Sequence, residues 1–294
     1  MTGLRVSHPD KIFWPEEGYT KLDLVRFYDD IFPWLAPFVR GRLLSMERCP
    51  DGLRGDCFYQ KQRPEGLPVG TPTKRIRHED HVVEYVVGGR KTTQLFLVNY
   101  GCIPVHVWGS RAASPRRPDW VCFDLDPPPD TFAEAVWAAR LVKEALTALG
   151  LLSFAKTSGG KGLHVFVPIQ VGPDADEVTA FAATLAERLV AAYPERLTME
   201  PRIRRRGHRV YIDTFRNAYA QTVVTPYSVR RRPGAPVSAP LDWSEVQPSL
   251  DPGRFTLRTM PARVREADPW ADFFKRRQSL RPAFQAVRHL DLAA

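Results

Sequence analysis

Two aspartates at the end of an apolar run are the residues of this chain best suited to catalysis. If residues 120–126 form a strand, Asp124 and Asp126 share one face and Phe123 and Leu125 the other, because side chains alternate along a strand. Same-side residues lie roughly 6.5 to 7 Å apart at Cα, so the two carboxylates can converge on one divalent cation or on a pair. Three prolines follow and end the strand. A simple turn at a strand end is the alternative explanation of these aspartates.

A third aspartate, Asp213, lies in another alternating run, residues 210–215. Three carboxylates around two divalent cations suit phosphoryl transfer, in which metals about 3.5 to 4 Å apart stabilise the attacking and leaving oxygens. Oxygen ligands favour Mg²⁺ or Mn²⁺, and a nearby imidazole such as that of His106 would shift the preference toward Mn²⁺. The carboxylates therefore predict metal-dependent chemistry on phosphates.

Residues 158–164, with the sequence Ser-Gly-Gly-Lys-Gly-Leu-His, could hold a triphosphate. Glycines such as Gly159 let backbone N–H groups approach phosphate oxygens closely. The hydroxyl of Ser158, the ammonium of Lys161 and the imidazole of His164 supply further hydrogen-bond donors. The spacing is not that of a P-loop, and a turn of this composition can also be purely structural.

Arginines gather before and after Asp213, and the formal net charge of the chain is +9. Such runs often form solvated loops, but beside an acidic metal site they suit triphosphates and nucleic-acid backbones. The net charge also fits a polyanionic partner. The arginines concerned are Arg202, Arg204, Arg205, Arg206, Arg209, Arg230, Arg231 and Arg232.

The elements that would position these residues follow in the order β-α-β-β-α-β between residues 120 and 215. This order is the split βαβ arrangement of ferredoxin-like and RNA-recognition folds, in which the first strand lies between the third and the fourth. The strand of Asp124 and Asp126 would then lie between the strands of His164 and Asp213. Three carboxylates from two neighbouring strands would converge.

The part before this core predicts a mainly antiparallel sheet. Its expected strands are residues 43–47, 57–61, 81–87 and 94–98, followed by an alternating run over residues 103–108. Phe58 and Tyr59, followed by Lys61, could form a platform for base stacking beside phosphate ligands, although paired aromatics on a strand are also common in cores.

A helix is expected to begin after Thr20, with Asp23 at its third position, and to run to about Phe32. Lys21 lies in its first turn, where the helix dipole disfavours a cation unless a bound anion faces both the lysine and the backbone N–H groups. A solvated lysine is the alternative.

The four cysteines show neither a C-x-x-C pair nor an accompanying histidine spacing. We therefore expect neither a zinc site nor a disulfide framework, but buried reduced thiols. No stretch approaches 18 apolar residues and the N-terminus lacks a secretion signal, so we expect a cytoplasmic protein without membrane contact.

Three motifs together resemble those of a known family. They are Phe-Asp-Leu-Asp-Pro at residues 123–127, Thr-Ser-Gly-Gly-Lys-Gly-Leu-His-Val at 157–165 and Val-Tyr-Ile-Asp at 210–213. They resemble the catalytic motifs of the primase-polymerase domain of bacterial ATP-dependent DNA ligase D, a member of the archaeo-eukaryotic primase superfamily. The resemblance covers nearly the whole chain.

The resemblance implies an α+β fold in which an RRM-like βαββαβ catalytic core packs with a second, mainly antiparallel β-rich subdomain. It implies one primase-polymerase domain over residues 1–294. Within it, residues 1–110 would form the β-rich part with a region that binds a 5′-phosphate, residues 111–232 the catalytic core, and residues 233–294 an extended wrap that ends in a basic helix near residues 268–287.

The resemblance also implies roles for single residues. Asp124, Asp126 and Asp213 match the catalytic metal ligands, and His106 matches a histidine that helps to hold Mn²⁺. Residues that match the nucleotide-binding set are Ser158, Gly159, Lys161, His164, Arg206 and Arg230. Residues that match the DNA-binding set are Lys11 and Lys21, which would grip a 5′-phosphate, with Phe58, Tyr59 and Lys61. The family leads us to expect a glutamine before Asn217, where this chain has Arg216.

The expected function is that of a DNA-dependent DNA/RNA polymerase, a nucleotidyltransferase that fills gaps and extends 3′ ends during non-homologous end joining. It would use two Mn²⁺ or Mg²⁺ ions, take NTPs or dNTPs with a preference for ribonucleotides, and act at the nucleoid. Expected partners are DNA with 5′-phosphorylated gaps or double-strand ends, a Ku-type end-binding protein and an ATP-dependent DNA ligase. The alternatives are a metal-dependent nuclease and a non-catalytic module that binds 5′-phosphorylated DNA ends.

Overall fold

The computed structural model describes residues 4–291 and divides them between two units, each built from three separate stretches of the chain. The first unit contains the described residues up to Ala113 together with Thr222–Ala239 and Gly253–Asp268. The second unit contains Ser114–Gln221, Pro240–Pro252 and the described residues from Pro269 onward.

The second unit is built on a six-stranded sheet in the order β11-β12-β8-β10-β9-β14. Only the β11–β12 pair is parallel, and the other neighbours pair antiparallel. β8 thus lies between β10 and β12, and the predicted β-α-β-β-α-β order is confirmed. The strands are β8 (Trp120–Asp126), β9 (Phe154–Thr157), β10 (Leu163–Pro168), β11 (Leu197–Thr198), β12 (Val210–Asp213) and β14 (Pro240–Leu241).

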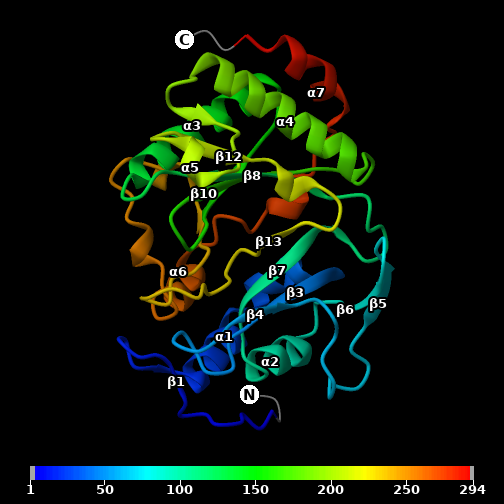
Figure 1. Cartoon of the computed structure of the whole chain (residues 1–294), viewed down its shortest axis with the longest axis vertical. Coiled ribbons are helices and arrows are strands. Elements are labelled where there is room, and N and C mark those ends of the chain that lie inside the picture. Colours follow the sequence, from blue (N-terminus) through cyan, green and yellow to red (C-terminus); the bar gives the residue numbers. More distant parts are fainter. Residues whose placement is uncertain (1–3, 292–294) are drawn as a thin grey trace. The chain divides into compact units, whose positions relative to one another are not determined.

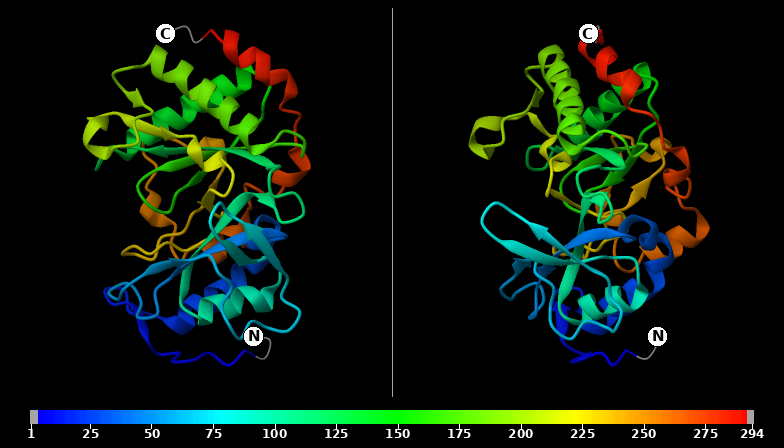
Figure 2. Two further views of the ribbon diagram at one scale, coloured as in Figure 1. Left: turned by 45° about the vertical axis from the view of Figure 1, so that its right-hand side comes forward. Right: turned by 90° about the vertical axis from the view of Figure 1, so that its right-hand side faces the viewer.

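Two long helices, α3 (Phe132–Ala148) and α4 (Ala175–Ala192), cover one face of this sheet (Figures 1 and 2). Val121, Phe123 and Leu125 point to that face and are fully buried. α4 begins with a capping box in which the Asp174 side chain accepts hydrogen bonds from the backbone of the first turn. The apolar side of β8 is therefore fixed against the helices, and its aspartates point to the opposite face.

Aromatic residues cover part of that opposite face. Trp120 and Phe166 meet edge to face at 5.5 Å, and Phe166 meets Trp270 at the same distance. Trp270 also stacks on Phe273 of the C-terminal stretch and donates its indole N–H to the carbonyl of Ala155. This stretch closes the end of the sheet face that is remote from Asp126.

The first unit contains a four-stranded antiparallel sheet in the order β13-β7-β3-β4 and a separate β5–β6 hairpin. The prediction of a mainly antiparallel, β-rich part is confirmed. Its strands are β1 (Ile12–Trp14), β2 (Tyr19–Thr20), β3 (Arg42–Arg48), β4 (Phe58–Gln60), β5 (Thr73–Arg77), β6 (Val82–Val86), β7 (Cys102–Arg111) and β13 (Thr222–Val224), and its helices are α1 (Lys21–Val39), α2 (Lys91–Asn99) and α6 (Met260–Glu266).

Two local predictions in this unit need correction. Residues 94–98, expected to form a strand, belong to helix α2, which packs on α1. A short apolar run such as Leu95–Val98 does not distinguish a strand from a buried helical turn. Helix α1 begins with the predicted Thr20–Asp23 capping box, but it continues beyond Phe32 to Val39 and includes two prolines.

The cysteines also depart in part from the prediction. Cys49 and Cys57 form a disulfide, because antiparallel pairing of β3 with β4 sets Arg48 opposite Phe58 and brings the flanking cysteines together. Cys102 and Cys122 are buried free thiols, as predicted.

The remaining elements are short. The helix expected near residues 268–287 is present but shorter, since this stretch contains a 3₁₀ turn and then the helix α7, which lies beside α4 through contact of Phe181 with Phe284 (Figure 2). No helix in the described part of the chain combines the length and apolar character needed to cross a membrane. These elements are α5 (Ile203–Arg206), α7 (Arg281–Ala286), and the 3₁₀ segments η1 (Phe215–Asn217), η2 (Trp243–Glu245), η3 (Pro252–Arg254), η4 (Phe273–Arg276) and η5 (Val287–His289).

Candidate active site

Four polar residues of the second unit form one row across its sheet. Asp213 on β12 pairs with Asp124 on β8, Asp124 pairs with His164 on β10, and His164 pairs with Lys156 on β9. Directly opposite residues in antiparallel strands point to the same face, so these four side chains are neighbours. Asp126 lies two residues beyond Asp124 on that face, which brings the three predicted carboxylates together.

Each carboxylate of this group already contacts a cation or a ring nitrogen. The Nε2 atom of His164 lies 3.1 Å from Oδ1 of Asp124. The Nε atom of Arg216 lies 3.1 Å from Oδ2 of Asp213 and 3.5 Å from Oδ2 of Asp124. Asp126 is more exposed, and its carboxylate lies 3.7 Å from Arg206.

The three aspartates differ in pKa because their surroundings differ. Burial would raise the pKa of Asp124, but the adjoining His164, Arg216 and Lys156 hold it well below its usual range. Burial and the charge of Asp124 raise the pKa of Asp126 to about 6, and burial also raises that of Asp213. Asp126 and Asp213 therefore hold a proton more readily than Asp124 does.

The donor set fits divalent cations. Three carboxylates on one sheet face supply oxygen ligands of the kind that Mg²⁺ and Mn²⁺ prefer, and the guanidinium of Arg216 already lies between two of them. As the side chains lie, no three His, Cys, Asp or Glu residues within residues 4–291 are arranged to hold a metal ion. A cation that used both Asp124 and Asp213 would have to take the place of Arg216.

The glycine-rich turn between β9 and β10 is well ordered by its own residues. The hydroxyl of Ser158 accepts hydrogen bonds from the backbone N–H groups of Gly160 and Gly162, both at 3.1 Å. Gly159 has a φ of +66°, which favours glycine, and a Cβ at Gly162 would lie 2.0 Å from the carbonyl oxygen of Leu125. The turn therefore lies against the end of β8, and Lys161 at its tip is exposed.

Arg206 and Arg230 belong to different units. Arg206, on α5 of the second unit, stacks its guanidinium 3.9 Å above the ring of Tyr211 and donates to the carbonyl of Glu200. Arg230 follows β13 in the first unit and is half-buried, with its backbone N–H bonded to Pro236. Arg206 thus lies beside the carboxylate of Asp126.

The two lysines predicted to bind a phosphate lie together at the start of α1. Lys21 is buried and donates to both the carbonyl and the hydroxyl oxygen of Ser7, while Lys11 pairs with Asp51. Burial, together with the nearby charge of Lys11, lowers the pKa of Lys21 to about 8. Two ammonium groups that repel each other beside a helix N-terminus are well suited to an anion.

The aromatic pair on β4 faces solvent and is not part of a core. Phe58 is 46% and Tyr59 63% exposed, and Lys61 is exposed just beyond them. The guanidinium of Arg48 lies 5.1 Å from the ring centre of Phe58. His106 is buried on β7 of the same unit, and its ring centre is 5.8 Å from that of Tyr59.

Two residues of the site were not predicted in their roles. Lys156 has no exposed surface, and its ammonium lies 2.9 Å from Nδ1 of His164. Arg216 was noted only as a departure from the family, although it contacts two of the three aspartates. The first could have been found from the sequence, because the tight turn at residues 158–162 fixes the partner of His164. The contacts of Arg216 could not, because they depend on the direction in which its side chain leaves a 3₁₀ turn.

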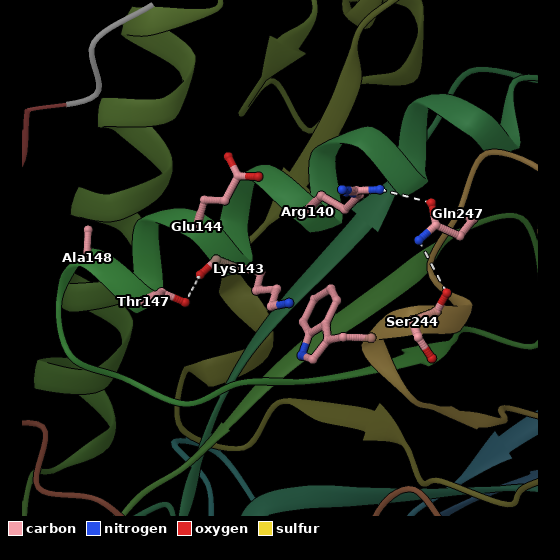
Figure 3. Close-up of a pocket in the computed structure, with 8 residues that line it drawn as sticks. Arg140, Lys143, Glu144, Thr147, Ala148, Ser244 and Gln247 are labelled. Atoms are coloured by element: carbon pink, nitrogen blue, oxygen red, sulfur yellow. Dashed lines mark hydrogen bonds between the residues drawn. The ribbon is translucent and has the colours of Figure 1, made fainter.

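A cavity of about 700 Å³ in the second unit lies away from these residues, between one side of α3 and the η2 segment (Figure 3). Arg140 donates to Gln247 there, and the ammonium of Lys143 lies 4.9 Å from the ring centre of Trp243. None of the predicted site residues lines it.

The chain resembles known proteins over most of its length. The model of the LigD primase-polymerase domain matches residues 20–270. The chain is 34% identical over 280 residues to the bifunctional non-homologous end joining protein LigD of Bacillus subtilis, which covers 94% of this chain and 45% of the relative. It is 33% identical over 299 residues to the multifunctional non-homologous end joining protein LigD of Pseudomonas aeruginosa, with 96% and 34% covered. The chain thus spans less than half the length of these curated relatives.

A solved structure shows the same fold. The polymerase domain from Mycobacterium tuberculosis ligase D, in complex with DNA, superposes with a TM-score of 0.88 at 26% identity, covering 95% of this chain and all of that one. The predicted fold class is confirmed. The family model, the relatives and this superposition confirm the resemblance inferred from the motifs: the chain belongs to the LigD primase-polymerase domain family.

Proposed function

We propose that this chain is a metal-dependent nucleotidyltransferase that adds nucleotides to a primer 3′ end, fills gaps and extends ends during non-homologous end joining. The observation that carries the proposal is the register of β12 with β8, which sets Asp213 opposite Asp124 and leaves Asp126 on the same face. Membership of the LigD primase-polymerase domain family supports it, because the relatives are named for end joining.

In the proposed reaction the primer 3′-hydroxyl attacks the α-phosphate of the incoming nucleotide in line and pyrophosphate leaves. Two Mn²⁺ or Mg²⁺ ions held by Asp124, Asp126 and Asp213 would stabilise the charge on the attacking and leaving oxygens. Lys161 and Arg206 bind the phosphates and neutralise the departing pyrophosphate.

The nucleotide preference is also proposed. We expect the enzyme to use NTPs in preference to dNTPs. The backbone N–H groups of the turn around Ser158 and Gly159, together with His164 and Arg230, are the further candidates for nucleotide contacts. The roles of Arg230 and of His106, as a ligand that favours Mn²⁺, stay predictions.

DNA is the proposed macromolecular substrate. Lys11 and Lys21 would bind the 5′-phosphate on the far side of a gap, where the buried ammonium of Lys21 and the more exposed ammonium of Lys11, which repel each other, gain an anionic partner. Phe58 and Tyr59 would stack on template bases, and Lys61 would contact the backbone. A Ku-type end-binding protein and an ATP-dependent DNA ligase are the proposed protein partners.

The test is extension of a labelled primer on gapped DNA with Mn²⁺ and either ribo- or deoxynucleotides. The wild type should add the templated nucleotide, with faster addition from ribonucleotides, and Asp126→Asn should not. Asp272→Asn is the matched control, because Asp272 is an exposed aspartate that pairs only locally with Lys275. Absence of addition by folded wild type would overturn the proposal.

Two other activities would give different results in the same assay. A nuclease that used these carboxylates would shorten the primer, and Lys161→Ala would leave that cleavage intact because cleavage needs no triphosphate. A module that only binds 5′-phosphorylated ends would bind the gapped DNA, and Asp126→Asn would change nothing measurable.

A further inference from the structure

We propose that Arg216 is a built-in counter-cation of the active site: it holds Asp124 and Asp213 together in the metal-free protein and must leave when a divalent cation binds. Arg216 thereby sets the cation concentration at which the site fills. This inference rests on the proposed function only in assigning a divalent cation to these aspartates.

The position of the Arg216 guanidinium is that of a cation shared by two carboxylates. Its Nε atom lies 3.1 Å from Oδ2 of Asp213 and 3.5 Å from Oδ2 of Asp124. The two aspartates are opposite each other in neighbouring strands and their side chains are only 10% and 13% exposed. Two partly buried like charges at this spacing repel each other, so the cation between them stabilises the metal-free fold.

The backbone of Arg216 cannot drift away from this place, because the next residue anchors it. The side-chain oxygen of Asn217 accepts from the backbone N–H of Cys122 at 2.7 Å, and its amide nitrogen donates to the Cys122 carbonyl at 2.8 Å and to the Thr214 carbonyl at 2.7 Å. Asn217 is buried, so these bonds are shielded from water. The 3₁₀ segment η1 is thus tied to β8 two residues before Asp124.

The remaining oxygens of the two aspartates already have partners. Oδ1 of Asp124 faces Nε2 of His164 at 3.1 Å. Oδ1 of Asp213 accepts from the backbone N–H of Phe215 at 2.9 Å. The oxygens that point into the shared space are therefore the two Oδ2 atoms, and Arg216 holds both. A divalent cation that binds both aspartates must therefore displace the guanidinium of Arg216. The positive charges of the cation and the guanidinium would also repel each other.

The side chain of Arg216 has somewhere to go, because it is 39% exposed while its backbone is fixed. Displacement therefore needs a change of side-chain rotamer and not a movement of the fold. Breaking the two ion pairs costs free energy and so weakens cation binding. The same two ion pairs stabilise the metal-free protein against unfolding. Removal of the charge should move these two quantities in opposite directions.

Three variants of the full chain test this. Arg216→Gln removes the charge, Arg216→Lys keeps a charge at that position, and Arg196→Gln is a matched control, because Arg196 pairs with Glu134 on the surface of the same unit. For each we would measure the melting temperature in EDTA and the Mn²⁺ dissociation constant by titration of the protein alone, without nucleotide or DNA.

We expect Arg216→Gln to bind Mn²⁺ at least 10-fold more tightly than wild type and to melt at a lower temperature in EDTA. Arg216→Lys should lie between the two, and Arg196→Gln should match the wild type in Mn²⁺ affinity. In wild type, the Nε–H resonance of Arg216 should shift when diamagnetic Mg²⁺ is added, as the two ion pairs break. A merely structural arginine would weaken Mn²⁺ binding when removed, since a disordered site binds less well.

Unchanged or weaker Mn²⁺ binding by Arg216→Gln, with the fold intact, would overturn the inference. So would Mg²⁺ binding that leaves the Arg216 resonance in place. The proposed function fails by a different result, which is the absence of nucleotide addition by a wild type that binds Mn²⁺.

Discussion

Two groups of predicted site residues are built in contrasting ways. One is the row of polar residues in the second unit, and the other is the cationic and aromatic set of the first unit, Lys11, Lys21, Phe58, Tyr59 and Lys61. Asp213, Asp124, His164 and Lys156 come from four strands, and the register of the sheet places them side by side on one face, where they are largely buried. Phe58 and Tyr59 are neighbours in the sequence and stay exposed. Groups that must act on one atom need the precision of a buried row, whereas groups that grip a flexible polymer need reach.

The contrast predicts that changes in the row abolish chemistry and spare binding. Asp213→Asn preserves shape but removes one carboxylate charge, so nucleotide addition should fall on the order of 10³-fold. Affinity for gapped DNA, measured by fluorescence anisotropy, should stay within about twofold of wild type. A variant that loses DNA affinity and addition to the same degree would show that the row is not specialised for chemistry.

Changes at the start of α1 should weaken recognition of the DNA end and spare nucleotide addition. Lys21→Met removes a buried ammonium, and a charge-assisted contact to a phosphate is typically worth about 1.5–3 kcal/mol, so the preference for a 5′-phosphate over a 5′-hydroxyl should fall by roughly 10- to 100-fold. Lys91→Met is the matched control, because this lysine of the same unit pairs with Asp29. Equal loss of the preference in both variants would point to general charge and not to this site.

The exposed aromatic pair should contribute to binding but not to folding. Tyr59→Ala should weaken binding to a gapped template by about 1–3 kcal/mol, the range for stacking of one base, and leave the melting temperature unchanged because the ring is mostly exposed. Anisotropy titrations and thermal melts measure the two quantities. A large drop in melting temperature would place Tyr59 in the core of the unit instead.

The smallest expected effect is a dependence of stability on pH. The pKa of Asp126 is raised from 3.8 to about 6. Between these two pH values the folded metal-free protein keeps a proton on Asp126 that the unfolded chain has lost. Asp126 therefore stabilises the fold below about pH 3.8, and this contribution is lost as the pH rises to about 6. Urea unfolding in EDTA should show the stability of wild type, relative to Asp126→Asn, falling between pH 4 and 6 and level above. A flat or rising difference would contradict the raised pKa.

The sequence was sufficient for the part of the site that follows from strand alternation and connection order. Alternation put Asp124 and Asp126 on one face, and the β-α-β-β-α-β order brought Asp213 alongside. It was not sufficient where side chains leave irregular backbone, as with Arg216 on a 3₁₀ turn. Short apolar runs also misled, since residues 94–98 are helical. The Cys49–Cys57 bond followed from the β3–β4 register, which cysteine spacing alone does not reveal.

The most direct test of the account is to ask whether chemistry and end recognition can be separated. Nucleotide addition and DNA affinity would be measured on gapped DNA with a 5′-phosphate or a 5′-hydroxyl for wild type, Asp126→Asn and Lys21→Met. We predict that Asp126→Asn loses addition but still binds the phosphorylated gap more tightly, and that Lys21→Met retains addition but no longer distinguishes the two ends. Loss of the phosphate preference in Asp126→Asn, or loss of addition on both DNAs in Lys21→Met, would contradict the account.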